Sequence, residues 1–334
     1  RRGDILGPDY LAGLELVNGL QADGVTHIAQ ASVWEVEEDS RILYTRDGAA
    51  AGVTARRILL ATGAIERPMP VPGWTLPGVM TAGAAQILLK QSGVVPRRAV
   101  LAGSGPLLYL LAVQLIRAGQ PPLALVETQR RRDLLAAWPH LGGAFAGRKH
   151  LAKGLSMLRE IRRAGVPRYT GAREIAIPGS AGVRGIRFVH RGTARELTCD
   201  AVFQHHGVVP NTNTARMLDI PHCWNAQQQA FLPEVDQWGR TQREAIYIAG
   251  DGAGIGGATA AALAGRLSAL RIACDLGYLE RDQLMRLAVG TQAALARERA
   301  FRPFLDRAYP PAAQALQPAD DIADAIFAQI KDRL

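Results

Sequence analysis

The sequence predicts an α/β fold with two dinucleotide-binding units, and two stretches carry this prediction. Residues 99–127 have the pattern strand, glycine loop, helix and strand, with Gly103 and Gly105 in the loop. Residues 246–258, IYIAGDGAGIGGA, form a second predicted strand that enters a helix through a run of glycines. The 334 residues suffice for two domains, and 48% hydrophobic with 21% charged residues is typical of a folded, soluble chain.

Charge and cysteine content exclude several classes of function. The formal net charge is +9, but the basic residues are scattered except at 130–132, and no aromatic residues alternate with them. This pattern disfavours nucleic-acid binding. The positive charge could instead attract an anionic dinucleotide or an acidic partner. Cys199, Cys223 and Cys274 stand far apart without a C-x-x-C pair. We therefore predict neither a redox disulfide nor a metal site.

Residues 99–116 are uncharged and long enough to suggest a membrane span. The sequence Gly-Ser-Gly-Pro in their first third indicates a buried strand, a tight loop and a buried helix instead. No signal peptide is recognised at the start of the chain. We therefore expect no transmembrane segment.

Hydrophobic patterning and turn residues place the remaining elements. Helices are predicted over 8–22, 81–90, 106–118, 132–164, 258–276, 280–308 and 320–333, and strands over 26–30, 32–38, 41–46, 53–63, 99–103, 123–127 and 245–249. Four segments follow as predicted domains: 1–94, the first part of one dinucleotide domain; 95–206, an inserted nucleotide-binding domain; 207–278, the second part of the first domain; and 279–334, a helical extension.

The inserted unit has the composition of a pyrophosphate-binding loop. Two glycines allow a tight turn, and the next helix directs its free N–H groups at the phosphates. Glu127, at the end of the following strand, is expected to accept hydrogen bonds from a ribose, which favours NAD over NADP. Leu108 replaces the third glycine and should loosen contact between helix and strand. The predicted contacts are Gly103, Ser104, Gly105, Pro106, Leu107 and Glu127. A purely structural βαβ turn is the alternative.

The second glycine-rich unit is typical of a flavin site. Asp251 follows its strand and is expected to accept a hydrogen bond from the ribityl or pyrophosphate side of a flavin. The next helix would direct its N-terminus at the flavin ring. The predicted contacts are Asp251, Gly252, Gly256, Gly257 and Ala258, with Thr62, Gly63, Val33 and Gly207 as further cofactor-binding candidates. A glycine-rich turn with an N-capping aspartate is the alternative.

No catalytic side chain is assigned, because hydride transfer between stacked rings needs no protein acid or base. Two adjacent histidines, His205 and His206, are candidates for metal binding or for acid–base chemistry. No carboxylate or cysteine stands at ligand spacing from them, so hydrogen bonding at the domain junction is the preferred interpretation.

With these motifs placed, residues 25–310 resemble the α subunits of bacterial opine oxidases, hydroxyproline and proline dehydrogenases and hydrogen cyanide synthases. The resemblance rests on the segments ATGAIERPMPVPGWTLPGVMTAGAAQILLK (61–90), LAGSGPLLYLLAVQLIRAG (101–119), HHGVVPNTN (205–213), PEVDQWGRT (233–241) and IYIAGDGAGIGGA (246–258). It implies a flavoprotein with two dinucleotide-binding domains, FAD in the domain of Asp251, NAD, ADP or ATP in the inserted domain, and a separate β subunit that oxidises the amine. It also implies a cytoplasmic location, with attachment to the inner membrane through partners as the alternative.

Two departures from that group modify the expectation. Such subunits begin with a strand–GxGxxG–helix unit for the ADP half of FAD, so this chain is expected to be N-terminally truncated. They often carry a cysteine-rich [2Fe-2S] segment, but no cysteine follows Cys274, so no cluster is predicted from this chain. The expected function is electron transfer between FAD and NAD or a partner's flavin. A non-catalytic nucleotide-binding subunit is the alternative, while a stand-alone reductase of thioredoxin-reductase type would need the absent C-x-x-C.

Overall fold

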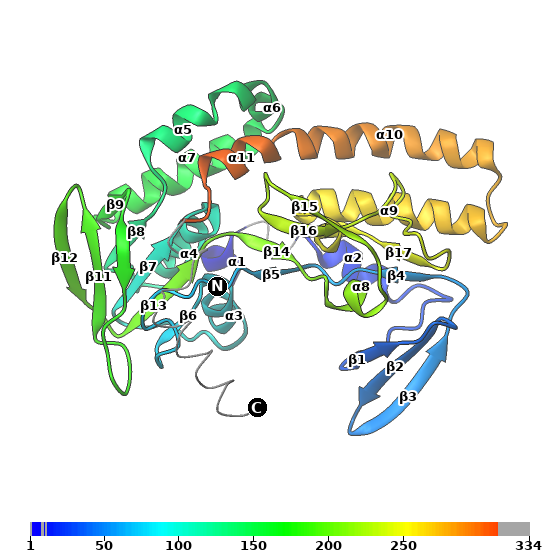
Figure 1. The fold of residues 1–334 in the computed structure, drawn as a ribbon, viewed down its shortest axis with the longest axis horizontal. Helices are drawn as coiled ribbons and strands as arrows, with labels where there is room; N and C mark the ends of the chain where they lie inside the picture. Colours follow the sequence, from blue (N-terminus) through cyan, green and yellow to red (C-terminus); the bar gives the residue numbers. More distant parts are fainter. Residues whose placement is uncertain (1, 8–9, 11, 313–334) are drawn as a thin grey trace, which may run out of the picture.

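The computed structural model describes residues 2–7, 10 and 12–312, and its largest sheet has five parallel strands (Figure 1). Their order is β6 (Val79–Thr81), β13 (Ala201–His205), β7 (Ala99–Gly103), β8 (Ala124–Glu127) and β9 (Arg168–Thr170). Every residue of β7, β8 and β13 is buried. A parallel sheet covered on both faces requires continuous apolar strands of this kind.

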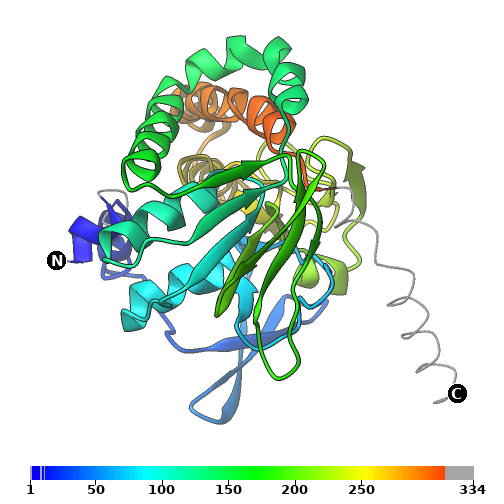
Figure 2. The same cartoon turned by 90° about the vertical axis from the view of Figure 1, so that its left-hand side faces the viewer.

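Alternate side chains of these strands enter two separate cores, as the two-residue period of a strand dictates. Leu101, Leu125 and Phe203 pack against the helices α3 (Ala82–Ser92), α4 (Pro106–Arg117) and α7 (Arg148–Arg163). Val100, Val126 and Val202 pack on the other face against an antiparallel sheet of β10 (Arg173–Ala176), β11 (Gly185–His190) and β12 (Thr193–Thr198). Figure 2 shows these green strands beside the cyan parallel strands.

The other half of the molecule is built around a short parallel pair, β4 (Ile58–Leu60) and β17 (Ile246–Ile248). Ile58, Leu60, Ile246 and Ile248 form its core with Leu218. Around this pair lie the antiparallel sheet of β1 (Ser32–Val36), β2 (Arg41–Arg46) and β3 (Ala49–Thr54), the hairpin of β15 (His222–Asn225) and β16 (Ala230–Pro233), and the helices α2 (Leu14–Gly19), α8 (Asn213–Met217), η3 (Gly250–Gly252), α9 (Ala258–Asp275) and α10 (Arg281–Ala300). The helix α1 (Arg2–Leu6) packs instead against α4 of the inserted half.

Two connections tie the halves together. The strands β5 (Ala64–Glu66) and β14 (Val208–Pro210) pair antiparallel between them. The helix α10 runs back over the molecule and delivers α11 (Arg302–Ala308) to the inserted half, beside α5 (Arg131–Ala136), η2 (Trp138–His140) and α6 (Leu141–Ala146) (Figure 1). Residues 280–308 of the extension are therefore packed against both halves.

Most predicted elements occur, with local differences. Of the expected helix over 8–22, the structure has only the short, fully exposed α2, and α1 precedes the predicted range. Residues 8, 9 and 11 of that range lie outside the described residues. The predicted strand 53–63 is divided into β3 and β4 by a bend at Arg56–Arg57, and 26–30 is not a strand. The predicted helix 320–333 also lies outside the described residues.

The parallel sheet begins earlier than the predicted domain boundary at residue 95. The strand β6 lies at its edge and pairs with β13, and α3 packs in the same core as α4. Thr81 starts α3 as predicted, because its hydroxyl accepts a hydrogen bond from the backbone N–H of Ala84. Leu108 is fully buried in that core, so a leucine at the third glycine position does not loosen contact between helix and strand.

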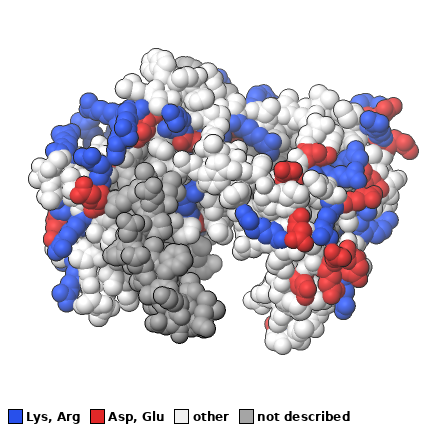
Figure 3. Space-filling model, viewed as in Figure 1, with Lys and Arg blue, Asp and Glu red and all other residues white. Residues whose placement is uncertain are grey.

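Within the described ranges, no helix has both the length and the apolar character needed to cross a membrane. Figure 3 shows basic side chains gathered over the inserted half, at the upper left, and acidic and basic side chains intermixed over the other half.

Candidate functional site

The carboxyl end of β17 turns into α9 through a loop that Asp251 holds in place. The Oδ1 atom of Asp251 accepts hydrogen bonds from the backbone N–H groups of Gly256 and Gly257, at 2.9 Å each. Ala258 then begins α9. Among the described residues, the second carboxylate oxygen of Asp251 has no hydrogen-bond partner. The side chain thus supports the loop with one oxygen and leaves the other available as an acceptor.

Three segments distant in sequence meet at this loop. A Cβ atom added to Gly252 would lie 2.9 Å from the hydroxyl oxygen of Thr62, which is too close for any side chain. The Thr62 hydroxyl donates to the backbone oxygen of Asn211 at 2.8 Å, and the N–H of Asn211 donates to the oxygen of Gly63 at 2.9 Å. The structure therefore brings together Thr62, Gly63 and Gly252, three of the predicted cofactor-binding candidates.

Gly207 lies at the opposite end of the β5–β14 pair from Gly63, where its carbonyl accepts a hydrogen bond from the N–H of Arg67 at 3.1 Å. Val33 lies apart from this pair. Its side chain belongs to the separate sheet of β1, β2 and β3 and is 57% exposed. The structure therefore gathers neither Val33 nor Gly207 with Thr62, Gly63 and Gly252.

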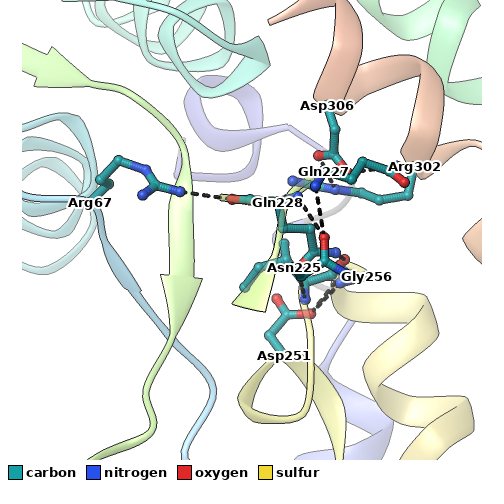
Figure 4. A network of polar contacts seen from close by, with 10 residues as sticks. Arg67, Asn225, Gln227, Gln228, Asp251, Gly256, Arg302 and Asp306 are labelled. Carbon is teal, nitrogen blue, oxygen red and sulfur yellow. Dashed lines mark hydrogen bonds and ion pairs between the residues drawn. The ribbon is translucent and has the colours of Figure 1, made fainter. Parts of the chain in front are cut away.

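A polar clamp that the sequence motifs do not reveal fixes the loop after Asp251 (Figure 4). The amide of Gln228 donates to the carbonyl of Ile255 and accepts from the N–H of Ile255, both at 3.0 Å. The guanidinium of Arg67 donates to the carbonyls of Gln228 and Gln229 at 2.9 Å, and burial lowers the pKa of Arg67. Gln228 lies in an unremarkable Gln-Gln-Gln run, so no sequence signal identifies this clamp.

This site has the features that a flavin requires. Two parallel strands end at it, the N-terminus of the long helix α9 faces it, and glycines bring the backbone close without side chains. The free oxygen of Asp251 supplies a hydrogen-bond acceptor for a ribityl hydroxyl. These residues therefore fit the predicted flavin.

The glycine loop of the inserted half lies against the end of β13. A Cβ atom on Gly103 would lie 1.9 Å from the carbonyl oxygen of His205, and one on Gly105 would lie 3.1 Å from its ring. The N–H of Ser104 donates to the same carbonyl at 2.7 Å. These strands, β7 and β13, flank the point where the strand order reverses, the usual ligand crevice of such sheets.

His205 and His206 have different environments. The Nδ1 of His205 lies 2.6 Å from Oε1 of Glu66, whose Oε2 accepts a hydrogen bond from the N–H of Gly83 at 2.6 Å. Junction hydrogen bonding is therefore confirmed for His205. His206 is buried; desolvation first, then the charges of His205 and Arg67, lower its pKa to about 3. Around His206 no group of three metal-ligating side chains is found in the described ranges.

Glu127 stands at the end of β8, as expected for a ribose acceptor, but its carboxylate is bound within the protein core. Its side chain is fully buried, and its carboxylate is bound by the guanidinium of Arg168 at 2.7 and 2.8 Å, by the Tyr109 hydroxyl at 2.5 Å and by the Gln129 amide at 2.6 Å. Burial, and then the charge of Glu127, raise the pKa of Tyr109. The interpretation of Glu127 as a residue that favours NAD is therefore corrected: the carboxylate is part of a core network.

Pro106 and Leu107 begin α4 but face apolar surroundings. They line a cavity of about 410 Å³ between α4, α7 and α11, together with Phe304 and Tyr309. Any contact of these two residues with a nucleotide would therefore come from the backbone of Leu107, because proline has no N–H.

Comparisons with known proteins agree with this architecture. A family profile described as pyridine nucleotide-disulphide oxidoreductase matches residues 2–277. The A subunit of opine oxidase from Rhizobium meliloti (strain 1021) is 39% identical over 96% of this chain and 70% of its own length. Its counterpart from Agrobacterium tumefaciens (strain Ach5) is 40% identical over 95% of this chain and 65% of its own. The crystal structure of L-proline dehydrogenase from P. horikoshii shares the fold, with a TM-score of 0.61 and 18% identity over 90% of this chain and 48% of that one.

The chain spans 62% to 70% of the length of the opine oxidase subunits that it matches. The match to the family profile confirms the predicted α/β class, and the two relatives confirm the resemblance stated from the sequence motifs. This chain belongs to the pyridine nucleotide-disulphide oxidoreductase family, within the group that contains the opine oxidase A subunits.

Proposed function

We propose that the chain is the FAD-binding subunit of an oxidoreductase that acts on an amino acid or opine. The observation that carries the proposal is the meeting of Asp251, Gly252, Thr62 and Gly63 at the ends of two parallel strands. FAD bound there would supply reversible electron transfer between a donor and an acceptor. The opine oxidase and hydrogen cyanide synthase relatives support the class of complex.

Each residue of the site has a defined part in this proposal. Asp251 would orient the ribityl chain through its free oxygen while it anchors the loop. The N-terminus of α9, with Gly256, Gly257 and Ala258, would stabilise negative charge on the flavin ring. Gln228 and Arg67 would act as positioning residues, because Gln228 bonds the loop at Ile255 and Arg67 bonds the carbonyl of Gln228.

We further propose that the inserted domain binds a nucleotide and that a β subunit of amine-oxidase type carries the substrate pocket. The glycine loop at the strand-order reversal supports a nucleotide there. Electrons would then pass between FAD and NAD(P) or a flavin of the partner. A cytoplasmic location, with any membrane contact made through partners, is part of the same proposal.

A second candidate function is a nucleotide-binding subunit without electron transfer, with all catalysis in the partner. The ion pair between Glu127 and Arg168 favours this second function, because the carboxylate expected to bind the adenosine ribose of NAD is already bonded within the protein.

Anaerobic addition of NADH or NADPH to the FAD-loaded chain separates the two candidates. Electron transfer predicts bleaching of the flavin absorption on addition of at least one of the two nucleotides. If the flavin stays oxidised with both nucleotides and with the reduced partner, the nucleotide-binding function without electron transfer is supported instead.

A further inference from the structure

Residues 62–67, which contain β5 and which we call the link segment, join the two halves of the molecule. Two adjacent side chains at its end bind to different halves. Glu66 contacts the inserted half, whereas the guanidinium of Arg67 reaches the hairpin of β15 and β16 in the other half (Figure 4). The N–H of Arg67 also extends the pairing of β5 with β14 through a hydrogen bond to the carbonyl of Gly207. The link segment therefore ties the halves together through side chains as well as through the chain itself.

Both oxygens of the Glu66 carboxylate are bound within the inserted half. Oε1 lies 2.6 Å from Nδ1 of His205, and Oε2 accepts a hydrogen bond from the N–H of Gly83 at 2.6 Å. Gly83 lies in the first turn of α3, where the helix dipole favours a negative charge. An added Cβ on Gly83 would lie 2.5 Å from Oε2, so the carboxylate fills the space that a side chain would need. Glu66, with 11% of its side chain exposed, therefore fixes the position of His205 at the end of β13.

His205 in turn holds the glycine loop of the inserted half. Its carbonyl accepts a hydrogen bond from the N–H of Ser104 at 2.7 Å and is the group that a Cβ on Gly103 would meet. Its ring lies against Gly105. The loop is thus packed on both the backbone and the side chain of one residue, and close packing of this kind transmits small displacements. A movement of Glu66 would therefore move His205 and the glycine loop with it.

The link segment also contacts the candidate flavin site of the other half. Thr62 and Gly63 at its start adjoin the place that a Cβ on Gly252 would occupy. At its end, Arg67 donates to the carbonyl of Gln228, whose amide fixes the loop that follows β17. At a strand's rise of about 3.3 Å per residue, the whole segment is about 17 Å long. One short, paired segment therefore contacts the candidate sites of both halves.

We propose that the link segment couples these two sites, so that a flavin bound at Asp251 also orders the glycine loop of the inserted half. A bound ligand restricts the groups that it contacts, and the groups packed on them lose mobility as well. Coupling is reciprocal, so a ligand at the glycine loop would tighten flavin binding by the same factor. Glu66 is a positioning residue, because it acts on the loop through His205. The inference rests on the proposed function, in which FAD binds at Asp251, and it requires no particular ligand in the inserted half.

Hydrogen–deuterium exchange of the whole chain, with and without FAD, tests this coupling. Mass spectrometry of peptides covering 252–258, the flavin loop, and 103–108, the glycine loop, reports on the two sites, and a peptide from β8 reports on global unfolding. FAD should slow exchange at least about fivefold in both loops of the native chain. In Glu66→Gln, the slowing should persist in the flavin loop and fall below about twofold in the glycine loop. An amide has a single acceptor oxygen and cannot replace both bonds of the carboxylate.

Glu160→Gln is the matched control for Glu66→Gln. The carboxylate of Glu160 accepts two hydrogen bonds from the guanidinium of Arg117, at 2.8 Å each, and is also in the inserted half. These bonds join α7 to α4 and not to the link segment, so the slowing in both loops should remain.

A second comparison needs no flavin. In the ligand-free chain, Arg67→Gln should speed exchange in the glycine loop at least about twofold, because the link segment loses its bonds to the hairpin of the other half. Arg98→Gln is the control for this change. It removes a guanidinium bond to the carbonyl of Thr198 and should leave exchange in the glycine loop unchanged.

The outcomes separate this inference from the proposed function. If FAD slows exchange in the flavin loop alone, if Glu66→Gln keeps the full slowing, or if Glu160→Gln loses it as well, the inference is overturned while flavin binding stands. If a folded chain takes up no FAD, the proposed function fails, and the ligand-free comparison decides the inference: equal exchange in Arg67→Gln and Arg98→Gln overturns it. The same comparison decides the inference if Glu66→Gln does not fold.

Discussion

The guanidinium of Arg168 donates two hydrogen bonds, at 2.7 and 2.8 Å, to the carboxylate of Glu127 at the end of β8. The side chain of Glu127 is 1% exposed, whereas that of Arg168 is 30% exposed. Glu127 was expected to contact a ligand, but through this pair it has a structural role and joins β8, β9 and α4.

Removal of one partner of this pair should destabilise the fold strongly. Arg168→Met leaves a buried carboxylate without a counter-charge, which costs about 3 kcal/mol in free energy of unfolding. Urea denaturation followed by circular dichroism measures the loss. Arg187→Met is the matched control, because the ion pair of Arg187 with Glu196 is exposed and should contribute less than about 1 kcal/mol. Equal losses in the two variants would contradict the assigned role of the Glu127–Arg168 pair.

Gly103 should tolerate no side chain. In Gly103→Ala, the added Cβ would meet the carbonyl of His205 at 1.9 Å, and the φ angle of +131° is itself unfavourable for alanine. We expect a loss of about 3 kcal/mol or more, measured as a lower melting temperature and a smaller unfolding free energy. Gly119→Ala shares the positive φ but has open space around it, so it should cost about 1 kcal/mol. Similar costs would mean that close packing is not the reason for the glycine.

Acid should destabilise the protein through His206. Its pKa is lowered to about 3 in the folded state, so the unfolded chain binds more protons below the ordinary histidine pKa. Stability is therefore lost as the pH falls from that value towards the folded-state pKa, by about 2 kcal/mol between about pH 7 and about pH 5.

Urea midpoints measured at the two pH values test the role of His206. His206→Asn should reduce the pH dependence of stability, whereas His140→Asn, at an exposed position, should leave it unchanged. An unaltered pH dependence in His206→Asn would show that other groups cause the acid loss.

The clamp made by Gln228 should matter for both stability and flavin retention. Gln228→Ala leaves the N–H and carbonyl of Ile255 without partners, which costs about 2 kcal/mol. FAD should also dissociate faster, measured by fluorescence after dilution, because the loop after Asp251 loses its support. Gln227→Ala removes only an exposed hydrogen bond to Asp306 and should change both quantities little. Faster dissociation in the control alone would argue against the clamp.

The sequence predicted the elements whose signals are local. Residues 99–103, 106–118 and 246–258 carry strand, glycine and helix patterns in consecutive order, and the structure has these elements within one or two residues. The buried ion pair of Glu127 could not be predicted from local patterns. Its partner Arg168 is 41 residues away on another strand, and no local pattern links them. The same holds for Gln228, whose partner Ile255 is 27 residues distant.

The central claim is that the convergence of Asp251, Gly252 and Thr62 forms a flavin site. The most direct measurement is the visible absorbance spectrum of the chain after incubation with FAD and desalting, with the cofactor released by heat and identified. We predict near-stoichiometric FAD in the native chain, little in Asp251→Ala, and full retention in Asp236→Ala. This last change removes another carboxylate that accepts two backbone hydrogen bonds in a loop. A colourless native chain that is folded, or equal retention of FAD by Asp251→Ala, would contradict the account.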